Sequence, residues 1–265
     1  MIKKFIFILT VLITAQSFSQ RSTSSPYSYF GVGEEFGTRT VEQISMGSIG
    51  AAYSSPSYLN FVNPASLSEL RLATYVFGVL NNDLTISDAN VKQSTNSTSL
   101  SYFSIAFPLT KKMAVVFGMQ PTSSVGYSLV NTLNNDEGNP VDITQYVGSG
   151  DVNRIYGGVG LKLFKGFSVG LELDFLFGNI QNSVLNIREE VALATKNVEN
   201  SNVRGGSVKF GAQYKTTLTK DINLHAGASI KLGNSLNSTG TENLYSLSIG
   251  ASGFEQPREP YSRAH

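Results

Sequence analysis

Few residues in this chain could do chemistry, and the first candidates are two carboxylates. Glu172 and Asp174 stand two residues apart, so in an extended strand they share one face, as paired catalytic acids would. The only histidines are His225 and the terminal His265, and a lone histidine favours neither a metal site nor a catalytic dyad. Solvated polar residues explain Glu172 and Asp174 better, so we expect no enzyme.

Other chemical signatures are missing from the sequence. There is no cysteine, and hence no disulfide framework, cysteine-based zinc site or lipid-modified N-terminal cysteine. Gly31, Gly33 and Gly37 have the wrong spacing for a dinucleotide-binding turn. The formal net charge is +1, and removing residues 1–20 would leave 18 basic residues against 19 acidic ones. We therefore expect no cofactor and no nucleic-acid partner.

The first 20 residues have the order of a signal peptide. Two lysines precede an apolar run over residues 5–15, and small residues follow. This run is shorter than the roughly 20 apolar residues that span a bilayer. We expect cleavage between Ala15 and Gln20 and export of the mature chain.

Three pairs of amphipathic strands, each joined by a very short turn, organise the body of the chain. In the clearest strand, apolar residues alternate with polar or small ones from Phe167 to Phe177, directly after a turn at Lys165 and Gly166. The same alternation surrounds turns at residues 110–112 and 219–221. The pattern predicts eight strands, at residues 72–80, 99–109, 113–130, 153–164, 167–185, 204–218, 222–233 and 243–253.

The predicted connections alternate in length. Long polar loops are expected at residues 81–98, 131–152 and 186–203, and a medium one at 234–242. Outer-membrane barrels keep short turns on the periplasmic side, so the first strand should start in the periplasm and the eighth should return there. Charged residues make up 15% of the chain, against about 25% in soluble domains. The sequence thus predicts an all-β, antiparallel transmembrane β-barrel in the bacterial outer membrane.

Residues 21–70 do not alternate like barrel strands. Small residues and turn formers dominate this segment, which suits a compact plug packed against other backbone. Its distinctive residues are Gly47, Gly50, Asn63, Pro64 and Ala65.

In the order of these motifs the chain resembles the outer-membrane transporters typified by the bacterial long-chain fatty acid transporter. Members begin with a signal peptide, a small-Gly-x-x-Gly-x-Ala segment and Asn-Pro-Ala, which match residues 46–52 and 63–65 here. The Ser-Pro-Tyr-Ser sequence from Ser25 is similar to the branch found in Bacteroidetes. The resemblance covers residues 1–130 by motif, and it implies a 14-stranded barrel whose lumen is plugged by residues 21–70.

The resemblance also implies an opening in the barrel wall. Pro121 and Gly126 interrupt the third predicted strand, and in the family a kink there lets an apolar substrate leave sideways into the membrane. Proline cannot donate to a sheet ladder, so the other interpretation is that the strand leaves the bilayer at Pro121. The residues expected to face the lumen are Glu172, Asp174, Lys209, Gln213 and His225.

Two features depart from the family. About eight strands are present, and an eight-stranded interior is filled by its own side chains, so it could not hold a plug of about 50 residues. Residues 255–265 contain two prolines and are expected to form an irregular tail. We therefore expect a C-terminally truncated product. The predicted organisation is a signal peptide (1–20), a plug or hatch segment (21–70), a partial barrel (71–254) and the tail (255–265).

The first functional hypothesis is a transporter-like barrel that takes up hydrophobic small molecules, with gating by the Asn63, Pro64 and Ala65 segment. The alternative is a non-transporting barrel that acts as a shuttle, plug or scaffold component of the type IX secretion machinery. A soluble secreted β protein is a third interpretation. The partners expected under the first two are outer-membrane lipid, a hydrophobic ligand and secretion-system proteins.

Overall fold

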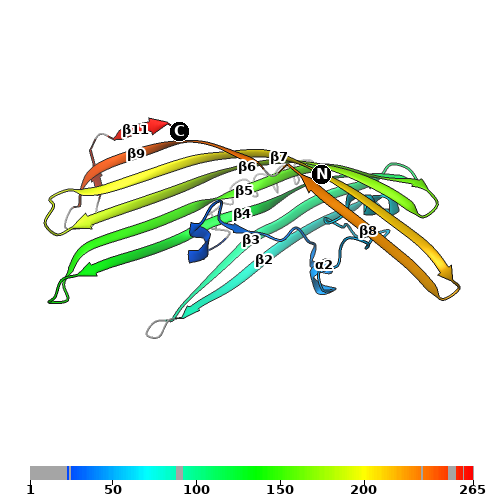
Figure 1. Cartoon of the computed structure of the whole chain (residues 1–265), viewed down its shortest axis with the longest axis horizontal. Helices are drawn as coiled ribbons and strands as arrows, with labels where there is room; N and C mark the ends of the chain where they lie inside the picture. Colours follow the sequence, from blue (N-terminus) through cyan, green and yellow to red (C-terminus); the bar gives the residue numbers. More distant parts are fainter. Residues whose placement is uncertain are drawn as a thin grey trace, which may run out of the picture.

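The computed structural model describes residues 23, 25–87, 92–233, 235–249, 255–258 and 260–264. The predicted signal peptide and His265 lie outside these residues. Within them the chain forms one mostly antiparallel sheet with almost no helix (Figure 1). The all-β antiparallel prediction is confirmed. A closed barrel is not formed by the described residues, because no pairing joins the two edges of the sheet.

Six long strands form an up-and-down meander in which each strand pairs with the next along the chain. The short turns predicted at residues 110–112, 165–166 and 219–221 are present. At the second of them Gly166 has a φ of 84°, which a glycine adopts without strain. The six strands are β2 (Thr74–Ser87), β3 (Lys92–Pro108), β4 (Met113–Asn134), β5 (Pro140–Phe164), β6 (Phe167–Arg188) and β7 (Ala194–Thr219).

The predicted long polar loops are wrong. Residues 92–98, 140–152 and 194–203 belong to strands, and the connections at that end of the sheet are only a few residues long. The polar ribbon of β2 and β3 shows the reason: Thr98 Oγ1 donates to Asn81 Oδ1 at 2.7 Å across the two strands. Polar side chains opposite each other therefore support a strand pair without an apolar face.

The last predicted strands also need correction. β8 (Ile222–Leu232) and β9 (Leu236–Ile249) pair with the same strand, β7, one after the other and in the same direction. They are one strand interrupted at Gly233, whose φ is 78°. The chain bulges at this glycine instead of turning back, so the loop predicted at 234–242 does not form.

The tail predicted to be irregular contributes the returning strand. β10 (Glu255–Pro257) and β11 (Tyr261–Ala264) both pair antiparallel with β9. Two prolines in this segment are compatible with strand structure because an edge strand can leave one side of its backbone unpaired.

One face of the sheet is apolar and exposed, and we call it the outer face. Two aligned rows of side chains cross it from strand to strand. The first consists of Phe77, Phe103, Met119, Ile155 and Phe175, and the second of Phe107, Val115, Val159, Leu171, Phe210 and Ile230. On β6 this apolar band runs from Phe167 to Phe177 and then gives way to Asn179 and Gln181.

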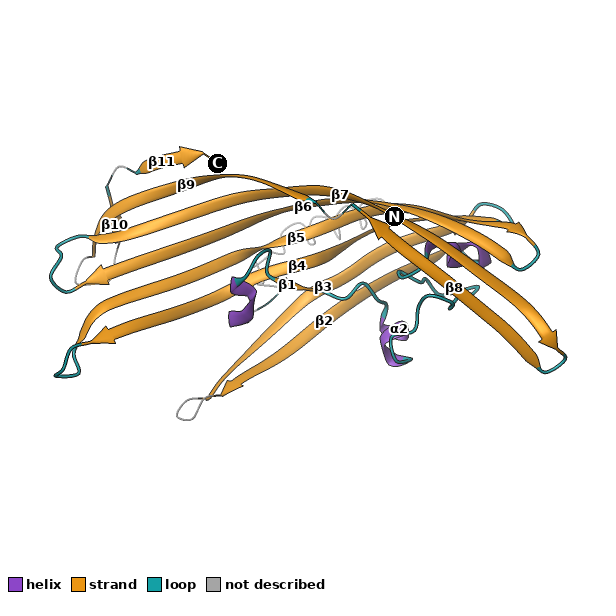
Figure 2. Ribbon diagram, viewed as in Figure 1, coloured by secondary structure: helices purple, strands orange, loops and turns teal. Residues whose placement is uncertain are grey.

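The N-terminal segment, residues 25–72, covers the other face, which we call the inner face (Figure 2). It contains two 3-10 turns, η1 (Pro26–Tyr29) and η2 (Pro64–Glu69), a two-residue strand β1 (Glu34–Glu35) and the short helix α2 (Val41–Ser45). Its apolar residues Leu59, Phe61, Leu67 and Leu70 form a buried core with side chains of β3, β4 and β5. No helix among the described residues has the length and apolar character to cross a membrane.

The conflict between a plug and a narrow barrel is thereby resolved. An open sheet presents a whole face, so about 50 residues can lie on it without filling a lumen. The segment is a layer over the sheet in this structure.

Candidate functional site

A row of small residues crosses the inner face and accepts the η2 turn. Ala114, Gly160, Gly170 and Gly211 are cross-strand neighbours on β4, β5, β6 and β7. A Cβ atom at Gly160 would come within 2.7 Å of Leu67 Cβ, and Cβ atoms at the other two glycines would overlap the turn at residues 63–65. The missing side chains let η2 lie directly on the backbone of the sheet.

Asn63 fastens the start of this turn. Its side chain is fully buried, and its Nδ2 donates to the carbonyl oxygens of Ala51 at 2.7 Å, Ala212 at 3.0 Å and Ala228 at 3.2 Å. Its Oδ1 accepts from the backbone N–H of Ala65 at 3.0 Å, which caps η2. Pro64 follows at the first position of the turn, where a missing N–H costs nothing. The predicted Asn-Pro-Ala segment is therefore the point of attachment to the sheet.

Three further buried amide side chains extend this attachment. Gln213 Nε2 on β7 donates to the carbonyl oxygens of Ala51 at 3.0 Å and Tyr53 at 2.9 Å. Asn60 Nδ2 donates to the same Tyr53 oxygen at 2.8 Å, and Asn60 Oδ1 accepts from Gln43 Nε2 at 2.7 Å. The backbone of the N-terminal segment thus obtains its hydrogen bonds from amide side chains where it has no regular structure.

A buried ionic cluster lies next to the attachment point. Arg154 on β5 has no exposed surface, and its Nη1 is 3.1 Å from Glu172 Oε1 and 3.0 Å from Asp174 Oδ1, both on β6. Lys209 Nζ on β7 is 2.6 Å from Glu172 Oε1, and Lys231 Nζ on β8 is 3.4 Å from Asp174 Oδ2. Three cations therefore surround two anions, and each carboxylate is held by two ion pairs.

Hydrogen bonds tie this cluster to its surroundings. Lys209 Nζ donates to the carbonyl oxygen of Phe61 in the N-terminal segment at 3.0 Å. Arg154 Nη2 donates to Gln120 Oε1 on β4 at 2.9 Å, and its guanidinium lies 4.5 Å from the centre of the Tyr156 ring. Buried charges require such compensation, so the cluster and the segment above it depend on each other.

A second ionic group holds the far end of η2. Glu69 Oε1 is 2.8 Å from Lys162 Nζ, and Glu69 Oε2 is 3.7 Å from Arg71 Nη2. Partial burial disfavours the charged carboxylate, but the hydrogen bond and charge of Lys162, with the charges of Lys215 and Arg71, hold the pKa of Glu69 below its ordinary value. This end of the segment is thereby fixed to β5 while Glu69 stays ionised.

Pro121 marks the place where β4 parts from β3. The ladder between these strands ends at Phe103 and Met119, and the register between β4 and β5 shifts between Pro121 and Ser123. Strand β1 then occupies the side of β4 that β3 has left. The strand continues through the proline to Asn134.

Gly126 lies further along the same strand and also contacts the N-terminal segment. Its N–H donates to Ser28 Oγ at 3.0 Å, and a Cβ atom here would overlap the carbonyl oxygen of Thr23. The space beside β4 is therefore occupied by the chain itself.

The remaining predicted residues lie apart from this arrangement. Gly47 ends the α2 turn with a φ of 75°, and a Cβ atom added there would meet no atom within 4 Å, whereas Gly50 packs against Val62. His225 is exposed on β8 opposite Lys215, near the short-turn end of the sheet. Of the predicted residues, the structure brings Glu172, Asp174 and Lys209 together in one group. A separate group consists of Asn63, Pro64, Ala65 and Gln213.

Several residues of the ionic cluster and of the attachment site were not predicted from the sequence. Arg154 and Lys231 both occupy polar positions in alternating strands, and this signal could have found them. The row of Gly160, Gly170 and Gly211 could not have been found, because it depends on the register between three strands.

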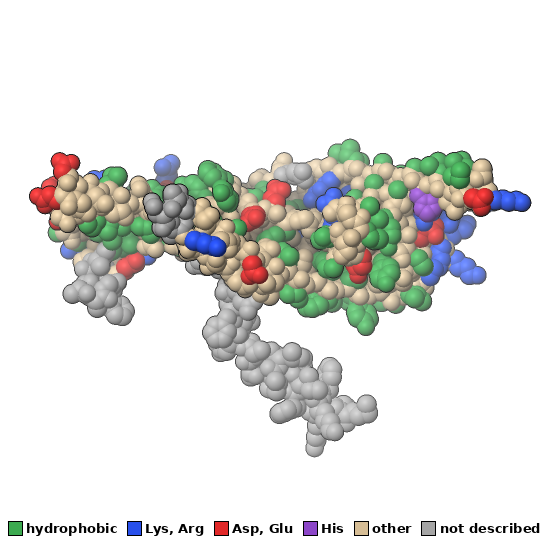
Figure 3. Space-filling view, turned by 90° about the horizontal axis from the view of Figure 1, so that it is seen from below, with side chains coloured by type: hydrophobic (Ala, Val, Ile, Leu, Met, Phe, Trp, Pro, Cys, Tyr) green, Lys and Arg blue, Asp and Glu red, His purple; other side chains and the backbone are tan. Residues whose placement is uncertain are grey.

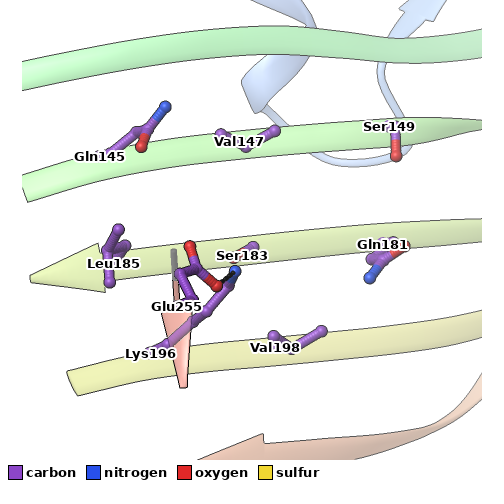
Figure 4. A pocket seen from close by; sticks show the side chains of 9 residues that line it. All are labelled: Gln145, Val147, Ser149, Gln181, Ser183, Leu185, Lys196, Val198 and Glu255. Atoms are coloured by element: carbon purple, nitrogen blue, oxygen red, sulfur yellow. Dashed lines mark hydrogen bonds and ion pairs between the residues drawn. The ribbon is translucent and has the colours of Figure 1, made fainter. Parts of the chain in front are cut away.

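The outer face above the apolar band carries a shallow polar depression of about 410 Å³ (Figure 4). In it Lys196 Nζ on β7 lies 2.5 Å from Glu255 Oε2 on β10. Its lining is polar or small apart from Val147, Leu185 and Val198, which shows where the outer face stops being apolar. Among the described residues, no three His, Asp or Glu side chains are placed to hold a metal ion.

A sheet with one apolar exposed face and a second face covered by its own chain is compatible with the class of outer-membrane β proteins. A family model described as BamG matches residues 1–262, so the chain belongs to the BamG family, which is associated with the Bam outer-membrane assembly complex. This membership gives the chain an outer-membrane-associated location. No curated protein and no solved structure matches the chain.

Family membership corrects the predicted resemblance and both functional hypotheses. The resemblance to the fatty acid transporter family was wrong, because the matching family is a different one. The hypotheses of hydrophobic-molecule uptake and of a type IX secretion component are wrong for the same reason, and the expectation of 14 strands loses its basis.

Proposed function

We propose that the chain is a non-catalytic accessory subunit of the Bam outer-membrane assembly complex, embedded through its apolar outer face. The observation that carries this proposal is the match to the BamG family over residues 1–262. The fold supports the membrane part of the proposal, since one face of the sheet presents aligned apolar rows to the outside.

The dimensions of the apolar band suit a bilayer. On β6 it covers the 11 residues from Phe167 to Phe177, and a transmembrane β-strand needs about 9–11. Beyond this band the outer face becomes polar, with Asn179, Gln181 and Ser183 outward on the same strand. Strand β7 has 26 residues, so the sheet would project well beyond the hydrocarbon on the side away from the short turns.

The inner face supports a scaffold role. Buried hydrogen bonds from Asn63 and Gln213, and an ionic cluster centred on Arg154, fix the N-terminal segment to four neighbouring strands. A segment held in this way forms a constant second layer behind the membrane face. We infer that the chain contributes a rigid wall to the assembly complex and does no chemistry of its own.

The test is affinity purification from outer membranes solubilised in mild detergent. The expected result is recovery of Bam components with the tagged chain, and a drop in several unrelated outer-membrane proteins when the chain is depleted. Recovery of the chain alone, with unchanged levels of those proteins after depletion, would contradict the proposal.

A matched pair of variants separates membrane insertion from complex formation. Phe175→Lys places a charge in the apolar band. Asn179→Lys places the same charge on the same face, at the first outward position beyond the end of the band at Phe177. If Phe175→Lys alone loses both the membrane and the Bam components, insertion through this face is required for the association.

A further inference from the structure

The turns of the sheet are sorted by charge between its two ends. The three short turns contain Lys111, Lys112, Lys165 and Lys220, with Asp221 as their only acidic residue. The two described turns at the opposite end, residues 135–139 and 189–193, contain four acidic residues and no basic one. Figure 3 shows Lys and Arg side chains gathered at one end of the molecule.

Apolar side chains flank the lysine of each short turn. Leu109 precedes the first turn, Phe164 precedes the second and Leu218 precedes the third, and all three are more than half exposed. In the second turn the rings of Phe164 and Phe167 stack with their centres 5.0 Å apart. The order apolar, lysine, apolar therefore repeats at three successive turns along the edge of the apolar band.

Two more cations lie behind these turns on the inner face. Lys162 and Lys215 project there near Arg71, and Glu69 is the acidic partner of this group. Among the residues that the structure describes, the short-turn end thus carries seven basic residues, Lys111, Lys112, Lys162, Lys165, Lys215, Lys220 and Arg71, against Glu69 and Asp221. We call this surface the basic rim.

We propose that the basic rim binds the phosphate headgroups of anionic phospholipids in the leaflet that the short turns reach. The repeated apolar neighbours decide between a lipid and an acidic protein, because a bilayer interface offers anionic headgroups directly above hydrocarbon. Lysines at the tips would meet phosphates while the flanking Leu and Phe side chains enter the acyl region. This inference goes beyond the proposed assembly role. It rests on only one part of that proposal, namely that the outer face lies in a bilayer.

The experiment measures lipid retained by the purified full-length chain, without partner proteins. The chain is equilibrated in mixed micelles with equal amounts of phosphatidylglycerol and phosphatidylcholine, captured by an affinity tag, and its bound lipids are counted by class. We expect phosphatidylglycerol to be enriched at least about threefold at low salt. The enrichment should fall towards equality in about 1 M salt, where the screening length is about 3 Å.

Two fourfold variants locate the effect. The rim variant carries Lys111→Gln, Lys112→Gln, Lys165→Gln and Lys220→Gln, and it should lose the enrichment. The matched control removes the same charge from exposed residues of the other end, with Lys92→Gln, Arg188→Gln, Arg258→Gln and Arg263→Gln, and it should keep the enrichment.

Equal retention of both lipids by the wild-type chain overturns the proposal, and so does an equal loss in the two variants. A rim variant that keeps its lipid preference in this assay, but no longer recovers an acidic protein in the separate purification from outer membranes, also overturns it in favour of a protein partner. The salt titration needs no variant, so a rim variant that fails to fold leaves the test intact. A failed Bam co-purification with intact lipid enrichment rejects only the assembly role.

Discussion

At the scale of single residues, the inner face depends on polar side chains that water cannot reach. Arg154 shares one nitrogen between two carboxylates, and Asn63 shares one amide between three carbonyl groups. Each of these side chains compensates several buried groups at once. Replacing either one should therefore cost more than the loss of a single hydrogen bond.

The Arg154→Met variant tests the ionic cluster. We expect a loss of about 3–5 kcal/mol in the free energy of unfolding, because Glu172 and Asp174 remain buried with reduced compensation. The measurement is urea unfolding of the chain in detergent or vesicles.

Arg188→Met is the matched control for this prediction. Arg188 pairs with Asp142 at 3.1 Å, a distance like that within the cluster, but its side chain is 63% exposed. Its removal should cost less than about 1 kcal/mol. Similar losses for the two arginines would show that the burial of the cluster does not matter.

The Asn63→Ala variant tests the attachment of η2. It removes the acceptor for the Ala65 N–H and leaves the carbonyls of Ala51, Ala212 and Ala228 without this donor. We expect a loss of about 2–4 kcal/mol and faster protease cleavage within residues 25–72.

Asn96→Ala provides the comparison for this variant. Asn96 also hydrogen-bonds through its side chain, to Asn81, but it is exposed on β3. The change should alter stability by no more than about 0.5 kcal/mol. Unchanged protease resistance in Asn63→Ala would mean that other contacts hold the segment.

At the scale of elements, the glycines of β5, β6 and β7 decide how closely η2 approaches the sheet. Gly170→Ala places a methyl group where residues 64 and 65 now lie. The turn must then lift away from the sheet, at an expected cost of about 1–3 kcal/mol. Cleavage of the N-terminal segment by added protease should become faster in parallel.

Gly206→Ala serves as the control, because the nearest atom to its added Cβ is Asp174 O at 3.7 Å. It should change neither stability by more than about 1 kcal/mol nor the cleavage rate. The prediction for Gly170 fails if the two alanine variants behave alike.

The elements also show what the sequence could predict. Alternation of residue types placed β6 and its short turn correctly, since one apolar face leaves a period of two in the chain. The same criterion missed the polar ends of β3, β5 and β7, because polar residues there interrupt the alternation. These polar stretches were therefore predicted as loops although they form strands.

The candidate site was predictable only in its local part. The residue types Asn63 and Pro64 are typical of a capped turn, and the position of Glu172 in an alternating strand indicates a polar face. The glycine row and the contacts of Arg154 depend on the registers between neighbouring strands, and these registers cannot be derived from a single sequence.

At the scale of the whole molecule, the sheet exposes its apolar outer face and buries charged side chains on its inner face, the reverse of a soluble protein. Leu173→Lys at the middle of the apolar band should cost about 2–4 kcal/mol when the chain refolds into lipid vesicles, since a charge on a lipid face is most costly at the midplane. The measurement is the urea dependence of that refolding.

Asn179→Lys lies on the same strand and the same face, beyond the apolar band. Its expected cost is about 0–1 kcal/mol. Equal tolerance of the two lysines would place the outer face in water and remove the physical support for the membrane role.

The whole molecule also explains why the motif resemblance misled. Asn-Pro-Ala caps a turn and docks it on a glycine-lined sheet. This is a solution to packing irregular backbone against strands, and it contains nothing specific to a transported molecule. The same residues can therefore serve families with different functions.

The hydrogen bonds of Asn63 have a consequence for the order of folding. Their acceptors Ala212 and Ala228 lie 149 and 165 residues further along the chain. Closing a loop of this length costs conformational entropy before any contact repays it. Asn63 therefore cannot complete these hydrogen bonds until β7 and β8 have paired, and until then its amide must find other partners.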